Sequence, residues 1–376
     1  VVGVLIWVDP DTDNDTMEKI NSDNAFTLST GDMVFICDNV KKRVPGSSMY
    51  TVYTDDDGNT TGEDFKGENL ITGTIKGVAE NRTPTVYFLS GHGEKSLDSY
   101  TKFTTNLTNY NYTAKELNLS ETDSVPDDAA LVLVAAPSKD ITDAEAEKLN
   151  AYLDNGGNIS LLMSPNGGAF AYTNLEAIMK DYGFYMDYDR VSETNSNYHI
   201  SGDKYTIQCE LNELDDDSEA TDLTSSLLNQ GLYTFMPESR SFRYNDEGGK
   251  YTIAPLITTY DSAEGEPYGG ISDDPEKQSG QMLLAADSTS IARNDSKMVV
   301  FGNAEFIDDE HVSDDTVIVP VYLFLSTISW MYDSDIDMEI STKSTTNDYI
   351  SLQDAGFAKG LMVVLTVIPV AIMAAG

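Results

Sequence analysis

The sequence predicts an α/β fold with a mostly parallel, flavodoxin-like or Rossmann-like sheet, and three observations carry this prediction. Residues 85–89 are a β-branched and aromatic run that stops at a Gly-His-Gly turn, after which apolar residues recur three or four apart, as in a helix. Residues 131–135 are unbroken apolar, which is typical of a strand covered on both faces. The connection from there to a further strand at 159–163 has the length of a right-handed parallel crossover.

The region before this domain is predicted to form an N-terminal, β-rich α+β segment over residues 1–80. Apolar runs at 1–8 and 33–37 indicate strands, and residues 49–54 open a hairpin. The apolar face over residues 69–80 indicates a helix.

Residues 81–340 are predicted to form one α/β domain. Its best-marked helix follows Thr142, whose capping box is completed by Glu145, and it ends at two glycines. Residues 187–246 give no clear prediction. The other predicted elements are strands at 112–119, 251–260, 281–287 and 297–302, and helices at 174–182 and 317–331.

The charge of the chain excludes one large class of functions. There are 23 Lys and Arg against 63 Asp and Glu, which gives a net charge of −40. Such a field repels nucleic acid, so no nucleic-acid partner is expected. The sequence also contains no Gly-x-x-x-x-Gly-Lys-Ser/Thr loop, and we predict no cofactor.

No metal site is predicted either. The Asp-rich loop over residues 9–15 does not fit an EF-hand, because Asn14 stands where glycine is needed and Ile20 where a glutamate is needed. Cys37 and Cys209 lack metal-ligand spacing and are expected to be small buried residues.

The candidate functional residues follow predicted strands. Loops at the carboxyl ends of parallel strands line the ligand crevice of open α/β sheets. One interpretation is a shallow polar crevice for a small ligand such as a sugar. The other is that the glycines make turns while His92 and Glu94 hydrogen-bond the loop backbone or cap a helix. The candidate residues are Gly91, His92, Gly93, Glu94, Pro137, Ser138, Asn166, Asn303 and Glu305.

An enzyme is not predicted. A Gly-x-Ser-x-Gly or Gly-x-Cys-x-Gly nucleophile elbow is missing from the sequence. The one triad that can be assembled is Ser138 with His92 and Glu94. Two carboxylates such as Glu94 and Glu305 could serve acid/base chemistry on a glycoside. A loop-edge His92 is also expected to tolerate replacement by alanine without loss of the fold.

The end of the chain changes character. Residues 341–359 are a polar linker, and residues 360–376 contain a single polar side chain, Thr366. Since a complete span needs about 20 residues, this stretch is predicted to be the start of a truncated transmembrane helix. The alternative is a hydrophobic core helix. The chain is expected to be part of a longer protein.

Taken together, the motifs resemble the GldG-type auxiliary components of ABC transporters, named from gliding motility. The matching motifs lie at residues 6–10, 91–94, 136–137, 156–157 and 300–306. The resemblance covers nearly the whole chain, but it lacks the usual N-terminal membrane segment and the basic residues after the last span. It implies a non-catalytic extracytoplasmic domain anchored in the cell membrane, working with a permease and a separate ATPase. It would also allow a carbohydrate ligand.

Overall fold

The computed structural model describes most of the chain. The described residues are 4–9, 12–21, 26, 28–38, 40–54, 60–65, 67–80, 84–110, 112–214, 220–228, 233–245, 249–270, 278–332 and 343–344. Contacts group the chain into a larger unit, residues 1–49 with 67–341, and a smaller unit, residues 50–66 with 342–376. The domain boundaries predicted at residues 80 and 340 stay predictions.

The larger unit contains the parallel sheet that the sequence predicts. Strands β6, β5, β7, β8 and β19 lie side by side in that order, and each neighbouring pair is parallel. Counted along the chain this order is 2-1-3-4-5, which is that of flavodoxin-like folds, and the α/β prediction is confirmed. The bounds are β5 Thr85–Leu89, β6 Thr113–Leu117, β7 Ala129–Ala135, β8 Ile159–Leu162 and β19 Ser296–Phe301.

The other half of the sheet is antiparallel, so the sheet as a whole is mixed. Strands β18, β15, β12 and β11 extend it beyond β19, while β13, β14 and β9 pair at its margin. Their bounds are β9 Phe184–Met186, β11 His199–Ile200, β12 Asp203–Leu211, β13 Thr234–Met236, β14 Phe242–Tyr244, β15 Tyr251–Thr259 and β18 Leu283–Ser290. A separate sheet contains β10 Asp189–Glu193, β16 Ala263–Pro267 and β17 Gln278–Ser279.

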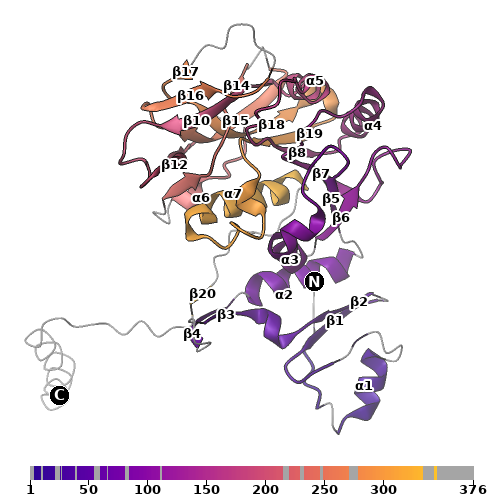
Figure 1. Ribbon diagram of the computed structural model, residues 1–376. Helices are drawn as coiled ribbons and strands as arrows, with labels where there is room; N and C mark the ends of the chain where they lie inside the picture. The colour runs from indigo at the N-terminus through magenta and orange to yellow at the C-terminus, as the bar shows by residue number, and fades with distance from the viewer. Residues whose placement is uncertain are drawn as a thin grey trace, which may run out of the picture. The chain divides into compact units, whose positions relative to one another are not determined.

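Helices cover both faces of the parallel half (Figure 1). Helices α3 (Thr101–Asn109) and α7 (Ile318–Met331) pack on one face, and α4 (Asp143–Asp154) and α5 (Thr173–Lys180) on the other. The strands serve both layers because alternate side chains point to opposite faces. In β5, Phe88 joins the core under α3 and α7, whereas Leu89 joins the core under α4 and α5.

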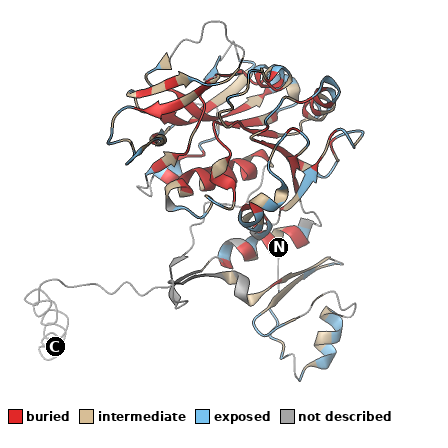
Figure 2. Ribbon diagram, viewed as in Figure 1, coloured by how far each residue is buried: buried red, intermediate tan, exposed pale blue. Residues whose placement is uncertain are grey.

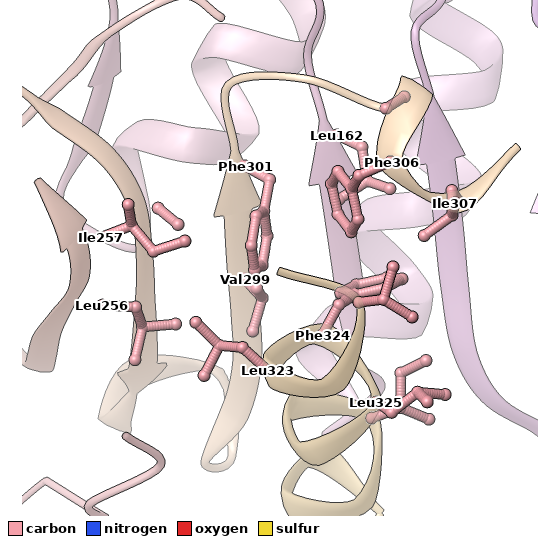
Figure 3. Packing of buried hydrophobic residues seen from close by; sticks show 14 of the residues in the cluster. Leu162, Leu256, Ile257, Val299, Phe301, Phe306, Ile307, Leu323, Phe324 and Leu325 are labelled. Atoms are coloured by element: carbon pink, nitrogen blue, oxygen red, sulfur yellow. The ribbon is translucent and has the colours of Figure 1, made fainter. Parts of the chain in front are cut away.

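The core under α7 is centred on aromatic residues (Figure 3). The ring centroid of Phe324 lies 5.5 Å from that of Phe301 and 5.9 Å from that of Phe306, both in edge-on arrangements. Such pairs add to the free energy gained by burial. Figure 2 shows that α7 and the central strands are largely buried, which explains why α7 is apolar around most of its circumference.

The N-terminal segment is partly as predicted. It contains α1 Asn14–Ile20, β1 Met33–Cys37, β2 Val40–Val44 and α2 Gly67–Glu80. The strand predicted at residues 1–8 is wrong for its described part, because residues 4–9 have no regular structure. Their apolar side chains face solvent, and Trp7 is 90 % exposed.

The smaller unit contains the hairpin that the sequence predicts. Strands β3 (Tyr50–Thr54) and β4 (Thr60–Phe65) pair in antiparallel register, and β20 (Lys343–Ser344) pairs with β4.

The described residues of the larger unit also form short helices. These are α6 Ser225–Leu228, η1 Gly46–Met49, η2 Leu97–Tyr100, η3 Ile291–Arg293, η4 Glu305–Ile307 and η5 Asp315–Val317.

Within the described residues, the helices are all too short or too polar to span a membrane. The residues predicted to begin a transmembrane helix, 360–376, lie outside the described part of the chain. So does the predicted polar linker, apart from residues 343–344.

Candidate functional site

The loop after β5 is shaped by two glycines and closed by a neighbouring loop. Gly91 and Gly93 have φ angles of +109° and +89°, in the region that favours glycine. A Cβ atom on Gly93 would lie 1.8 Å from the hydroxyl oxygen of Ser138, so no larger residue fits there. Between the two glycines, His92 turns inward and is only 3 % exposed. The loop therefore holds an ionisable side chain inside the protein.

His92 lies between two carboxylates. Its Nδ1 is 3.2 Å from Oε1 of Glu94, and its Nε2 is 3.1 Å from Oε2 of Glu145. Only the imidazolium carries a proton on both nitrogens, so only the charged form can donate to both carboxylates. The hydrogen bond to Glu94 is the largest effect on the pKa of His92; with the one to Glu145 it outweighs burial and raises that pKa above 6.5.

Glu145 joins this loop to helix α4. Its Oε2 accepts hydrogen bonds from the backbone N of Thr142 at 2.8 Å and from the Thr142 hydroxyl at 2.6 Å, which confirms the predicted capping box. Burial acts to raise the pKa of Glu145, but the hydrogen bonds from Thr142 and His92 lower it overall. The carboxylate of Glu145 thus takes part in the N-terminal capping box of α4 and also balances the charge of the buried His92.

The contacts of Ser138 do not form the triad considered from the sequence. Its hydroxyl donates to the backbone carbonyl of His92 at 3.2 Å, while both ring nitrogens of His92 face carboxylates. Glu94 in turn accepts from the backbone N of His92 at 2.7 Å through Oε2. The interpretation that these side chains hydrogen-bond the loop backbone therefore holds for Glu94, whereas the ring of His92 contacts two carboxylates instead.

The loops after β8 and β19, which carry the candidate residues Asn166, Asn303 and Glu305, meet at the carboxyl ends of these strands. The backbone N of Ala304 donates to the Ser164 hydroxyl at 3.0 Å. Asn303 is buried, and its amide donates to the carbonyl of Glu238 while its oxygen accepts from the backbone N of Glu305. These side chains shape the loops by hydrogen-bonding their backbones.

A buried arginine that sequence reasoning missed lies at this second meeting point. Arg240 is 0 % exposed, and its Nη2 donates to the backbone carbonyl of Ser164 at 2.9 Å. The guanidinium carbon lies 5.7 Å from the ring centroid of Tyr172 and 5.6 Å from that of Tyr188. Within the described residues, Nε and Nη1 have no hydrogen-bond partner and no carboxylate forms a salt bridge with the guanidinium.

Tyr172 connects the two halves of the sheet edge. Its hydroxyl donates to the carbonyl of Pro137 at 2.6 Å and accepts from the Asn166 amide at 3.4 Å. The predicted segments are therefore linked along the edge, with residues 91–94 against Ser138 at one end and Ser164 against residues 303–305 at the other. Ligand binding at these residues stays a prediction.

A possible cation site outside this edge is already occupied by the ammonium group of Lys95. Ligand atoms of Asp308, Glu310 and His311 lie within 4.8 Å of one another. The carboxylate of Asp308 accepts from Lys95 Nζ at 2.6 Å and faces His311 Nδ1 at 2.7 Å. The lysine charge opposes a metal ion at this position.

The fold and the edge define a doubly wound α/β domain whose loops converge at the switch between the first and third parallel strands. The family described as an ABC-type uncharacterized transport system matches residues 83–320. The chain belongs to this family of ABC transporter auxiliary components, and its role is that of a transporter accessory protein.

Two solved structures show a limited similarity to the chain. The first is the mmIFT52 N-terminal domain, with 16 % identity and a TM-score of 0.48, covering 67 % of this chain and 99 % of that one. The second is the exo-β-1,4-mannosidase Op5Man5 from Opitutaceae bacterium strain TAV5, with 9 % identity and a TM-score of 0.33, covering 76 % and 41 %. Neither likeness is strong enough to carry a functional argument. No curated protein matches the chain.

Proposed function

We propose that the chain is a non-catalytic, GldG-like subunit of an ABC transporter, anchored in the cell membrane with its α/β domain on the extracytoplasmic side. The observation that carries the proposal is the family match, which spans the five strands of the parallel sheet and helices α3, α4 and α5. ATP hydrolysis would come from a separate chain, since this sequence has no phosphate-cradling loop. The partners would be that ATPase and a permease.

Two further observations support a role in assembly. The ionisable residues nearest the switch point are fully engaged with one another, because His92, Glu94 and Glu145 satisfy each other's polar atoms. Exposed apolar side chains occur together at Val4, Leu5, Ile6 and Trp7, and contiguous apolar surface suits contact with a membrane or another chain. The apolar stretch 360–376 would supply the anchor.

The test is affinity purification of the tagged full chain from its native membranes in mild detergent. We expect an ABC permease and an ATPase with a Walker A motif to co-purify. A variant that lacks residues 360–376 should leave the membrane fraction and lose both partners. Arg243→Met, which changes an exposed side chain, is the matched control and should retain them.

Two results would contradict the proposal. One is a wild-type chain in the soluble fraction without transporter components. The other is turnover of glycosides, esters or amides by the purified protein that Ser138→Ala abolishes, which would indicate a hydrolase.

A further inference from the structure

The unpaired guanidinium of Arg240 has a physical consequence that the transporter role does not explain. An arginine stays protonated in proteins, so burial cannot be relieved by loss of its proton. Burial lowers the pKa of Arg240, and the charges of neighbouring acidic groups, among them Asp189 and Glu176, oppose this shift. A buried charge without a paired counter-charge is costly, and native proteins usually supply a partner.

The surrounding acids are committed to other donors. Asp189 accepts from the backbone N of Ser241 at 2.9 Å and from its hydroxyl at 2.7 Å. Glu176 accepts from the hydroxyl of Tyr188. Burial also raises the pKa of Asp189, which weakens it as a counter-ion. The described residues around Arg240 thus leave three N–H groups, one on Nε and two on Nη1, without an acceptor.

The rings of Tyr172 and Tyr188 form a cage around the guanidinium of Arg240, as aromatic side chains do in recognition sites for cations. Tyr172 and Tyr188 stack with ring centroids 6.4 Å apart, and both rings face the guanidinium. Outside Tyr188 the chain runs as glycine-containing loops. The backbone N of Gly270 donates to the carbonyl of Gly168 at 2.8 Å, and a Cβ on Gly270 would lie 2.5 Å from the Tyr188 ring. There is therefore no room for a side chain at Gly270, where the backbone lies against the Tyr188 ring.

We propose that Arg240 is the anchor of a binding site for a small organic anion, held through a carboxylate group. Arginine offers planar N–H donors that match the oxygens of a carboxylate. Asp189 and Glu176 act on the guanidinium from nearby, so a singly charged carboxylate meets less repulsion than a doubly charged phosphate. The net charge of −40 opposes the approach of any anion, but this long-range field is screened beyond about 8 Å at physiological ionic strength.

This site differs from the crevice predicted at residues 91–94, and it goes beyond the accessory role. It lies at the carboxyl ends of β8 and β19. There Nη2 of Arg240 donates to the carbonyl of Ser164, and the backbone N of Arg240 donates to the carbonyl of Gly302 at 2.9 Å. The proposal needs no permease or ATPase. Its failure would therefore leave the transporter proposal intact, and the reverse also holds.

The experiment measures the thermal unfolding midpoint of the full chain against increasing sodium acetate, inorganic phosphate or sodium chloride at constant ionic strength. We expect a saturable rise with acetate, because a ligand that binds only the folded state stabilises it. Phosphate should give a smaller rise, and chloride no saturable one. Arg240→Met should lose the rise with acetate, and Arg243→Met, an exposed arginine paired with Asp187, should keep it.

A second measurement covers the case in which Arg240→Met fails to fold. The Nε–H resonance of Arg240, assigned by its absence in Arg240→Lys, should shift with acetate in the wild-type protein. An unchanged resonance would overturn the proposal. So would an equal rise in Arg240→Met, a larger effect of phosphate or chloride than of acetate, or no saturable rise with any salt, which would mean that internal water satisfies the guanidinium.

Discussion

A buried cation lies at each end of one sheet edge, but only one of the two cations is paired with carboxylates of the chain. At the β5 and β7 end, His92 lies between Glu94 and Glu145 and its charge is balanced within the chain. At the β8 and β19 end, Arg240 is equally buried but has aromatic rings and one carbonyl around it. A charge paired internally serves the fold, whereas an unpaired one calls for a partner from outside.

The largest expected effect is at the paired end. His92→Gln leaves the carboxylates of Glu94 and Glu145 buried without a cation, which should cost about 3–5 kcal/mol of unfolding free energy. This replaces the expectation from sequence that His92 tolerates substitution. Urea unfolding at pH 6 measures it, and His199→Gln, on the sheet margin, should change the value by about 0.5 kcal/mol or less. A loss below about 1 kcal/mol at His92 would show that the cluster is not structural.

The pH dependence of stability should report the same cluster. The pKa of His92 is raised above 6.5 in the folded state, so its contribution is full below about pH 6.5 and is lost as pH rises through the folded pKa. The pKa of Glu145 is lowered, so its contribution is full above about pH 4.5 and is lost as pH falls. Chemical unfolding from pH 4 to pH 9 should show a fall above pH 6.5 that His92→Gln abolishes. An equal fall in both proteins would show that a group other than His92 causes the loss of stability above pH 6.5.

A smaller effect is expected at a third buried ionisable group. Asp287, in β18, is buried with Oδ2 unbonded, and burial raises its pKa well above the usual value of 3.8. The folded state retains this proton, so stability falls as pH rises from about 3.8 to the folded pKa. Asp287→Asn removes that loss and should stabilise the protein by about 1–3 kcal/mol at pH 7, measured by urea unfolding. Destabilisation would indicate a counter-ion for Asp287.

The smallest effect belongs to a half-exposed pair. Lys95 Nζ contacts Asp308, and the lysine side chain is 50 % exposed. Lys95→Met should cost about 1 kcal/mol at most, because solvent screens the lysine and His311 still faces Asp308. Added salt should reduce the difference from wild type. A loss of stability as large as that expected for His92→Gln would mean that solvent exposure does not determine how much these ion pairs stabilise the protein.

Some of this organisation is readable in the sequence and some is not. Strand β7 and helix α4 were predictable because an unbroken apolar run and a capping box are local patterns. In the antiparallel half, β15 and β18 match the strands predicted at 251–260 and 281–287. Strands β9, β13 and β14 were not predictable, because three residues each are too few for alternation to mark them.

The meeting of these loops was predictable from the sequence, but their side-chain contacts were not. The strand-end rule correctly brings residues 91–94 to Ser138. The partner that decides the state of His92, Glu145, is 53 residues away and looked like a capping residue alone. Arg240 lies in a stretch without periodicity, and a lone arginine there resembles a surface residue until the fold buries it.

The most direct test compares the two cations in one experiment. His92→Gln and Arg240→Met would be unfolded in urea at pH 6 in a buffer free of carboxylates. The account predicts that His92→Gln loses about 3–5 kcal/mol while Arg240→Met stays within about 1 kcal/mol of wild type or gains stability, as when a buried charge is replaced by an apolar side chain of similar size. Equal large losses in both variants would contradict it, because Arg240 would then be as structural as His92.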